Sequence, residues 1–375
     1  MKNVFQQSAI LGLFLLICLG ISAQNGVTLP PSGSNMKSVI KQQVGLAWVK
    51  ISYGSPDVAG REGKIWGQLV PYGTTDFVAQ GFGTATEGPW RAGANENTTI
   101  SFSHDVLVEG EKLVAGTYGL HIIPAEEGPW TLIFSHNSTQ WGSYFYTEDE
   151  DALRVEVETQ EAPFSEYLRF DFPVRNLDEA VAALYWENLQ VPFRIQVENV
   201  ADQYIAQMRK DLQSTAGFTW MGYRGAAAYC LQQGKNLEEA LQWAEIALSH
   251  PFIGDKNFNT LQTKTELLYA LENKEAAEES LMETLAEGTP MQVYQYGSGQ
   301  AQQEKTEKAV KIFEFAAERD PDTWLSHAGL AAGYRIQGEK AKAIKHYKAA
   351  MKTAPDQWKS SLEARIKQVE EAEGR

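Results

Sequence analysis

Two stretches near the C-terminus, AVKIFEFAAERDP at residues 309–321 and AIKHYKAAMKTAP at residues 343–355, decide the fold of that half of the chain. They share alanines, an aromatic residue and a final proline at matching positions, each displaced by 34 residues. The matching pairs are Ala309 and Ala343, Phe313 and Tyr347, Ala316 and Ala350, and Pro321 and Pro355. Small residues let neighbouring helices pack closely, and proline ends a helix because it lacks an amide hydrogen. The pattern therefore predicts a repeated helical hairpin.

Two further copies of the pattern precede these stretches. One consists of Ala240, Ala244, Ala247 and Pro251, and a degenerate one consists of Ala277 and Leu281. The period and the spacing resemble those of tetratricopeptide repeats. We therefore expect an all-α domain of tetratricopeptide-like helical repeats over residues 199–375, with about four repeats between Phe218 and Pro355. A helix from about Val200 to Gln213 would precede the repeats, and a helix from Asp356 to Glu373 would cap the stack.

Residues 37–198 follow a different pattern. Apolar and polar residues alternate with a period of two, which is typical of strands with one buried face. Examples are Val49, Ile51 and Tyr53, then Ile100 and Phe102, and then Leu168, Phe170 and Phe172. Turn-forming pairs such as Glu109-Gly110 separate these segments. Many short strands without intervening amphipathic helices predict an all-β domain, either an antiparallel β-sandwich or an open barrel.

The end of this β domain contains one more turn signal. The alternating residues Val191, Phe193, Ile195 and Val197 follow Tyr185-Trp186 across the short polar stretch Glu187-Asn188. A two-residue polar stretch between two alternating runs is a hairpin signal. We therefore expect a closing hairpin with its turn at Glu187-Asn188.

The N-terminus has the layout of a signal peptide. Lys2 supplies a positive start, residues 10–21 form an apolar run, and Ile21-Ser22-Ala23 gives a small-residue end. The run is shorter than the roughly 20 residues that a membrane-spanning helix needs. We expect cleavage near Ala23, a linker over residues 24–36, export to the periplasm or the cell surface, and no integral membrane span.

Cysteine content, charge and missing motifs narrow the function further. A mature chain would keep only Cys230, so no intramolecular disulfide is expected. The net charge of −15 argues against nucleic acid as a partner, because phosphate binding depends on Lys and Arg. The sequence has no Gly-x-Ser-x-Gly, His-Glu-x-x-His or phosphate-loop motif. We therefore assign no catalytic residue, no metal ligand and no cofactor.

The order of motifs in the β domain resembles that of the family called domain of unknown function 2911. The motifs are ISYGSPDVAGREGKIWGQLVPYG at residues 51–73, PWRAGANENTTISF at 89–102 and VEGEKLVAGTYGLHIIP at 108–124, followed by WTLIF and WGSYFY. The family occurs mostly in exported Bacteroidetes proteins, often beside tetratricopeptide repeats, and the resemblance implies no established activity. It covers about Lys37 to Val197. One departure is a longer Gly/Thr-rich segment at residues 74–89, which we expect to form a flexible flap or an extended hairpin.

The stretch from Trp90 to Glu96 is the first candidate binding loop. An exposed Trp90 would form a stacking platform for a sugar or an aromatic ligand, and Arg91, Asn95 and Glu96 would supply polar contacts. Alternatively, Trp90 closes one end of the sandwich, and Arg91 and Glu96 pair with each other or with Arg61. Such pairs fix the geometry of a loop without any ligand. The sequence leaves both interpretations open.

A rival hypothesis makes the protein an envelope hydrolase or a metal-dependent enzyme, with its site in the β-domain loops around Arg61, the stretch from Trp90 to Glu96 and the segment at residues 74–89. His104, His121 and His136 each lie on or at the end of a different predicted strand, and three imidazoles can bind zinc where they converge. Nothing in their spacing brings the three together. Dispersed surface histidines are the simpler interpretation.

The helical repeats allow a firmer functional inference. Stacked hairpins form a concave groove lined by the first helix of each repeat, and such grooves usually bind peptides or partner proteins. In the last repeat we expect Leu325, Ala328, Ala332 and Arg335 to face this groove, where Arg335 can hold a carboxylate. Alternatively, the β domain or the capping helix fills the groove. We predict a non-enzymatic binding or assembly protein of the cell envelope, whose partner is another envelope protein or a peptide.

Overall fold

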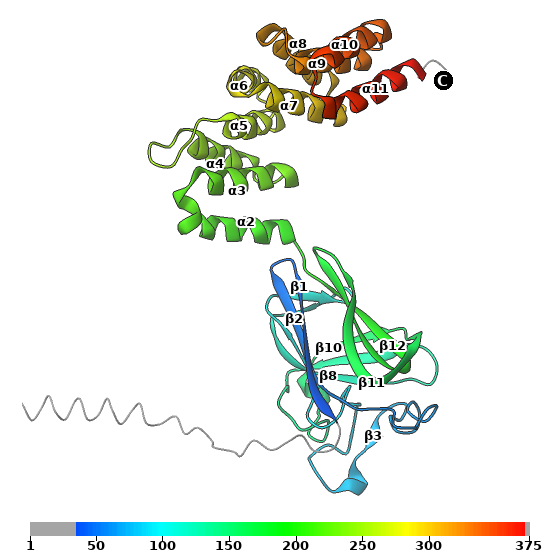
Figure 1. The fold of residues 1–375 in the computed structure, drawn as a ribbon. Coiled ribbons are helices and arrows are strands. Elements are labelled where there is room, and N and C mark those ends of the chain that lie inside the picture. Colours follow the sequence, from blue (N-terminus) through cyan, green and yellow to red (C-terminus); the bar gives the residue numbers. More distant parts are fainter. Residues whose placement is uncertain (1–34, 372–375) are drawn as a thin grey trace, which may run out of the picture. The chain divides into compact units, whose positions relative to one another are not determined.

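The computed structural model describes residues 35–371, so the expected signal peptide lies outside the described residues. The chain folds into two compact units, with the boundary after Val200. The first unit contains the strands and the second contains α-helices (Figure 1). In the part of the chain that the structure describes, no helix is both long and apolar enough to span a bilayer.

The β domain contains two large antiparallel sheets and one small one. The six-stranded sheet has the order β1 (Met36–Val44), β2 (Ala47–Ser55), β5 (Thr99–Phe102), β8 (Gly116–Ile123), β9 (Trp130–Ser135) and β10 (Asp151–Val157). The four-stranded sheet has the order β11 (Gln160–Arg175), β12 (Glu179–Gln196), β6 (Val106–Val108) and β7 (Glu111–Leu113). The small sheet pairs β3 (Thr75–Asp76) with β4 (Glu87–Gly88).

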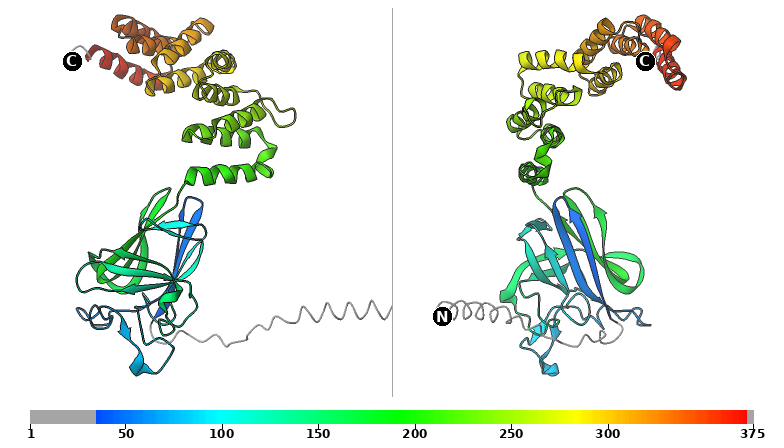
Figure 2. Two further views of the ribbon diagram at one scale, coloured as in Figure 1. Left: turned by 180° about the vertical axis from the view of Figure 1, so that it is seen from behind. Right: turned by 60° about the vertical axis from the view of Figure 1, so that its left-hand side comes forward.

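The two large sheets enclose the apolar core of this domain (Figures 1 and 2). The ring of Tyr53 on β2 lies 4.9 Å from that of Phe170 on β11. The ring of Phe134 on β9 lies 6.3 Å from that of Phe193 on β12. All four side chains are buried. Burial of such residues from both sheets is the main stabilising interaction in this type of fold. The predicted all-β domain is confirmed, and of the two expected forms it is the antiparallel β-sandwich.

The prediction of a closing hairpin with its turn at Glu187-Asn188 is wrong. β12 continues through these residues and pairs with β11 across a turn at residues 176–178. Glu187 has a φ of 53° and lies at a bulge where the register with β11 shifts. Its buried carboxylate accepts a hydrogen bond from the amide of Gly63. A contact between residues distant in sequence therefore holds this polar residue inside the strand.

Residues 74–89, the segment that departs from the family pattern, form a short hairpin. β3 and β4 pair directly, and a 3-10 turn, η2 (Val78–Gln80), lies between them. The amides of Thr84 and Ala85 donate to the carbonyl of Tyr144 at 3.0 and 2.9 Å, and the Phe77 ring lies 4.9 Å from the Tyr144 ring. The hairpin is thus packed against the loop that follows β9.

The second unit consists of helices that follow one another as antiparallel pairs (Figure 2). They are α2 (Val200–Asp211), α3 (Trp220–Gln233), α4 (Leu237–Ser249), α5 (Phe258–Ala270), α6 (Lys274–Glu287), α7 (Pro290–Gln302), α8 (Thr306–Arg319), α9 (Trp324–Ile336), α10 (Lys340–Thr353) and α11 (Asp356–Glu371). The hairpin α9–α10 repeats α7–α8 with a displacement of 34 residues at every helix boundary. The predicted tetratricopeptide-like fold is therefore confirmed.

The small residues of the repeat have the packing role that the sequence predicts. Ala240, Ala277, Ala309 and Ala343 are each fully buried. A Cβ atom at Gly297 on α7 or at Gly329 on α9 would lie 2.6 or 2.8 Å from the ring of Phe313 on α8. These distances leave no room for a side chain, so the glycines allow α8 to lie directly against both first helices.

Cys230 lies in the apolar core between α3 and α4. Its side chain is fully buried beside Ala227 and Trp243 and has no disulfide partner among the described residues. Burial raises the pKa of its thiol, which keeps the sulfur protonated and unreactive.

Candidate functional site

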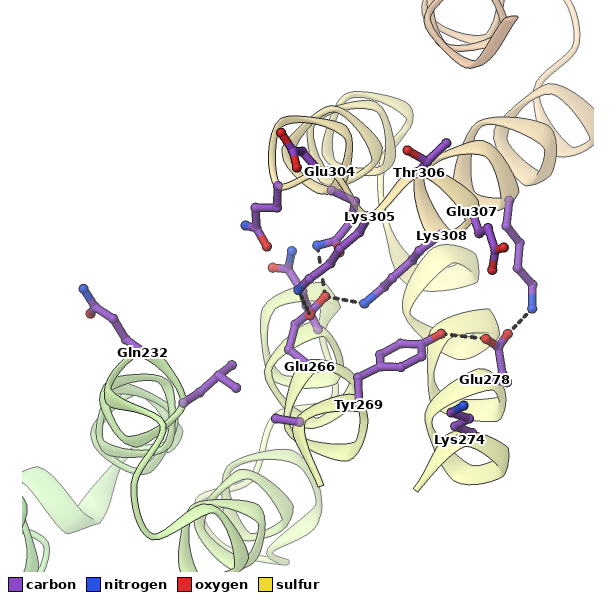
Figure 3. A pocket seen from close by; sticks show the side chains of 16 residues that line it. Gln232, Glu266, Tyr269, Lys274, Glu278, Glu304, Lys305, Thr306, Glu307 and Lys308 are labelled. Atoms are coloured by element: carbon purple, nitrogen blue, oxygen red, sulfur yellow. Dashed lines mark hydrogen bonds and ion pairs between the residues drawn. The ribbon is translucent and has the colours of Figure 1, made fainter. Parts of the chain in front are cut away.

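The helical unit contains a cavity of about 1240 Å³ that is lined by the ends of several helices (Figure 3). The C-terminal parts of α3, α5 and α7 and the first residues of α6 and α8 contribute its walls. Its charged side chains are Lys274, Lys305, Lys308 and Lys311 with Glu266, Glu278, Glu304 and Glu307. Because positive and negative side chains are equal in number, the lining carries no net formal charge.

Most of these charges are paired with one another. Glu266 accepts a hydrogen bond from Lys308 at 2.7 Å (Figure 3). It also accepts one from Gln300 at 3.2 Å. The hydroxyl of Tyr296 donates to the same carboxylate. The Lys308 ammonium lies 3.8 Å from the centre of the Tyr269 ring, and burial lowers the pKa of this lysine. The side chains that line this cavity are therefore held together by the chain's own ion pairs.

A second cavity, of about 400 Å³, adjoins the first between α5 and α7. The two cavities share Gln262, Gln300 and Gln303. No charged residue lines the second cavity, whose polar side chains are all amides or a tyrosine hydroxyl. The amide residues are Asn259, Gln262, Gln292, Gln295, Gln300 and Gln303. We call this set the amide strip.

The predicted groove residue Arg335 lies in a third cavity, of about 430 Å³, together with Arg365. α7, α9 and α11 form its walls, and buried Phe313 and Tyr347 also line it. The two arginines are the only charged residues in this lining. The hydroxyl of Ser298, which also lines the cleft, is buried without a hydrogen-bond partner. We call this cavity the arginine cleft, and its chemistry suits an anionic group.

The other three residues expected to face this groove divide into two groups. Ala332 lines the arginine cleft beside Arg335, as expected. Ala328 is fully buried in the core between α9, α10 and α11, and Leu325 is also buried. The repeat pattern does not point to Arg365, because this residue lies on the capping helix, outside the repeated unit. Its place on a face of α11 that adjoins α9 and α7 makes the cap part of the cleft.

Arg61, the first β-domain candidate, is bound to its own loop. Its guanidinium donates to the carbonyl of Val58 at 2.8 Å and to that of Asp57 at 2.7 Å. The Asp57 carboxylate lies 3.5 Å away. Arg61 therefore closes the turn in which it lies instead of pairing with Glu96.

Trp90 is half-buried in a cluster of four tryptophans. Its backbone exchanges two hydrogen bonds with Ile122, each 2.8 Å long, which fixes it at the side of β8. Its ring stacks at 6.1 Å on that of buried Trp186, and Trp66 contacts both rings edge-on. Trp66 also contacts Trp130. The cluster packs Trp90 against the domain instead of presenting it as a free platform.

The remaining loop candidates do not converge. Arg91 donates to the carbonyl of Asn95 at 2.7 Å, and its guanidinium lies 5.3 Å from the centre of the Tyr144 ring. Asn95 has a φ of 63° at the turn of the loop. Glu96 is exposed, so the expected pairing of Arg91 with Glu96 gives way to a contact between Arg91 and the backbone.

His121 is fully buried, so its interpretation as a surface histidine is wrong. Its ring nitrogens lie 3.0 Å from the Ser143 hydroxyl and 3.3 Å from the Gln140 amide. Burial, with a smaller contribution from Arg91, lowers its pKa to about 3. His104 and His136 are exposed. Among the described residues, no group of three or more His, Cys, Asp or Glu side chains is placed to hold a metal ion.

Comparisons with known proteins agree with this division of the chain. The family model described as "Protein of unknown function (DUF2911)" matches residues 35–195, which confirms the resemblance of the β domain. No match was found among curated proteins.

Solved structures of tetratricopeptide repeat proteins are similar to the helical region. MamA is 15% identical, with 45% of this chain and 93% of that chain covered and a TM-score of 0.29. YrrB, described as a TPR protein with an unusual peptide-binding site, is 20% identical, with 45% and 84% covered and a TM-score of 0.27. A tetratricopeptide repeat protein from Parabacteroides merdae is 20% identical, with 46% and 70% covered and a TM-score of 0.28.

Proposed function

We propose that this protein is an exported, non-enzymatic binding or assembly factor of the cell envelope. Its helical repeats would recruit a partner protein by holding an acidic group of that partner, such as a C-terminal carboxylate, in the arginine cleft. The β domain would supply a second ligand or partner surface. The observation that carries the proposal is that Arg335 and Arg365 are the only charged residues lining the arginine cleft.

Charge supports this choice of ligand. The whole chain has a net charge of −15, so a cleft whose only charged residues are two arginines is a local exception to the charge of the protein. Guanidinium groups bind carboxylates through paired, charge-assisted hydrogen bonds. The unpartnered Ser298 hydroxyl can add a neutral hydrogen bond in the same cleft.

The test uses the full chain and peptides displayed with free C-termini. One peptide selected from a random 12-residue library would be synthesised as the free acid and as the C-terminal amide, and binding would be followed by fluorescence anisotropy. We expect the amide, and the double variant Arg335→Gln/Arg365→Gln, to weaken binding at least about tenfold, because one charge-assisted hydrogen bond contributes about 1.5–3 kcal/mol.

The matched control is Lys345→Gln/Lys352→Gln, which removes two positive charges from exposed positions on α10 outside the cleft. We expect less than about a twofold change from this control, since surface charges are screened by salt. Equal losses for the two double variants, or an unchanged affinity for the amide, would overturn the assignment of the cleft.

Export is a separate part of the proposal and has its own test. The leader-like residues 1–23 support it. Cell fractionation followed by N-terminal sequencing should find the protein outside the cytoplasm with a new N-terminus close to Gln24. An intact Met1 in a cytoplasmic fraction would contradict this part alone.

A further inference from the structure

The amide strip between α5 and α7 has a chemistry different from that of the arginine cleft. Its polar side chains are primary amides and a tyrosine hydroxyl, and none of its lining residues is charged. A primary amide presents a donor and an acceptor side by side, as a peptide group does. A strip of such groups can therefore pair with the main chain of an extended polypeptide whatever its side chains are, except at Gln292, whose amide oxygen already accepts from the amide of Thr289 at 2.9 Å.

Gln300 supplies the first independent sign of a ligand. Only 4% of this residue is exposed, and it lines both adjoining cavities. Its amide nitrogen donates to Glu266 at 3.2 Å, but its carbonyl oxygen has no hydrogen-bond partner. Buried acceptors are normally satisfied. A donor from a molecule in the groove, such as a peptide N–H, would satisfy this one.

Gly299 supplies the second sign. It lies inside α7, where glycine weakens a helix, and it lines the cavity of the amide strip. A Cβ atom at this position would meet no atom of the chain within 4 Å, in contrast to one at Gly297, which would lie 2.6 Å from Phe313. Packing within the protein explains Gly297 but not Gly299. The missing side chain at Gly299 allows another backbone to approach the helix closely.

The aromatic residues of this cavity argue against a sugar ligand. Phe258 and Tyr296 are buried, and their rings meet edge-on at 6.1 Å. Neither ring is therefore open as a flat stacking surface, which is how an aromatic side chain holds a sugar. The lining also has no charge that would select a charged side chain.

We propose that the amide strip binds an extended, uncharged polypeptide segment of the partner through its main chain, with the segment's backbone lying over Gly299. This inference rests on the proposed function, because it describes how the recruited partner is held beyond its acidic group. α7 gives one side to the arginine cleft, with Ser298 and Gln302, and another side to the amide strip, with Gln295 and Gly299. One helix thus separates a charge-selective site from a backbone-binding site.

The experiment compares Gly299→Ala with Gly225→Ala in the full chain. Gly225 is also inside a first helix and has open space at its Cβ, but it lines none of the three cavities. Both variants should raise the Tm of the helical unit by a similar amount, about 2 °C. Only Gly299→Ala should weaken binding of the selected peptide, by about tenfold, because its methyl group occupies the space of the bound backbone.

The same peptide also tests main-chain recognition directly. N-methylation at alternate peptide nitrogens of its uncharged segment should weaken binding at least about tenfold, since it removes several donors. Alanine substitution of the same residues should change affinity less than about threefold. Equal affinity of the N-methylated and parent peptides, or an unchanged affinity of Gly299→Ala, would overturn the inference.

The outcomes separate this inference from the proposed function. Loss of binding in Arg335→Gln/Arg365→Gln with full binding in Gly299→Ala would support the role of the arginine cleft and overturn the role of the amide strip. Failure of the wild-type chain to select any peptide would overturn both. Displacement of the peptide by maltohexaose or chitohexaose, with loss of sugar binding in Gly299→Ala, would overturn the inference. The ligand of the amide strip would then be a glycan and not a polypeptide.

Discussion

The loops of the β domain and the clefts of the helical repeats contain similar side chains but use them differently. Arg61 and Arg91 donate to carbonyl oxygens of their own loops. Arg335 and Arg365 face a cleft whose lining has no carboxylate. His121 likewise has a hydrogen-bond partner from its own domain at each ring nitrogen. A polar residue in a loop is therefore weak evidence for a ligand until its neighbours are known.

The largest expected effect tests whether the tryptophan cluster stabilises only its own domain. Trp186→Ala removes a buried ring that stacks on Trp90, so the free energy of unfolding of the β domain should fall by about 3–5 kcal/mol. Urea unfolding followed by far-UV circular dichroism should shift the β transition and leave the helical one unchanged. Trp141→Ala, at a side chain that is 46% exposed, is the control and should change stability by less than about 0.5 kcal/mol. A shift of the helical transition would contradict the separation of the two units.

Acidification gives the next largest effect and acts through His121. Its folded-state pKa of about 3 lies below the ordinary value of 6.5, so the unfolded chain binds one more proton between these values. The stabilisation is present above pH 6.5 and is lost as the pH falls toward 3. Between pH 6.5 and 4.5 the β domain should lose about 2–3 kcal/mol from this group.

The control for this prediction is His104→Gln, at an exposed histidine. The stability difference between wild type and His121→Gln should shrink as the pH falls, whereas His104→Gln should change the stability by less than about 0.5 kcal/mol. Parallel pH profiles for wild type and His121→Gln would show that His121 is not the group concerned.

An intermediate effect concerns the ion pair between Lys308 and Glu266 in the largest of the three cavities described above. Lys308→Met leaves the mostly buried carboxylate of Glu266 without its 2.7 Å partner, and the helical unit should lose about 1–2 kcal/mol. The exposed pair Lys311 and Glu278 offers the comparison, because Lys311→Met should cost less than about 1 kcal/mol. Thermal unfolding of the helical unit would measure both. Equal costs would mean that burial does not strengthen the Glu266 pair.

The smallest expected effect is a gain in stability. Gly299→Ala and Gly225→Ala should each raise the free energy of unfolding of the helical unit by about 0.5–1 kcal/mol, because alanine restricts the unfolded chain and favours helix. Chemical denaturation would detect the gain. A loss of stability in Gly299→Ala alone would show that the position is filled by the protein itself and is not open to a ligand.

The repeats could be predicted from the sequence because their signal is local. The displacement by 34 residues that pairs Ala309 with Ala343 also describes the helix boundaries, and period-two alternation identified the core faces of β2, β5 and β11. Two features that depend on distant contacts were predicted wrongly. A turn at Glu187 is the wrong prediction because its partner Gly63 is 124 residues away. A surface position for His121 is wrong because Gln140 and Ser143 cover it.

The candidate site was predictable in part for the same reason. Arg335 follows from its position in the repeat, but Arg365 lies on the capping helix, outside the repeated unit. The amide strip was missed even though Gln292 and Gln295 lie one turn apart on α7, and a search for polar residues at helical spacing would have found them. What the sequence does not contain is the position of α5 opposite, which turns a polar helix face into a cavity.

The burial of Cys230 makes the first hairpin of the repeats a reporter of its own motion. A thiol reagent added in excess would modify this cysteine only during moments when α3 and α4 separate, because the closed state shields the sulfur and keeps it protonated. In a chain that begins after Ala23, Cys230 is the single cysteine, so the labelling rate measures opening of this hairpin under native conditions without any mutation. Slower labelling in the presence of a bound peptide would show that binding at the later helices reduces opening of the α3–α4 hairpin.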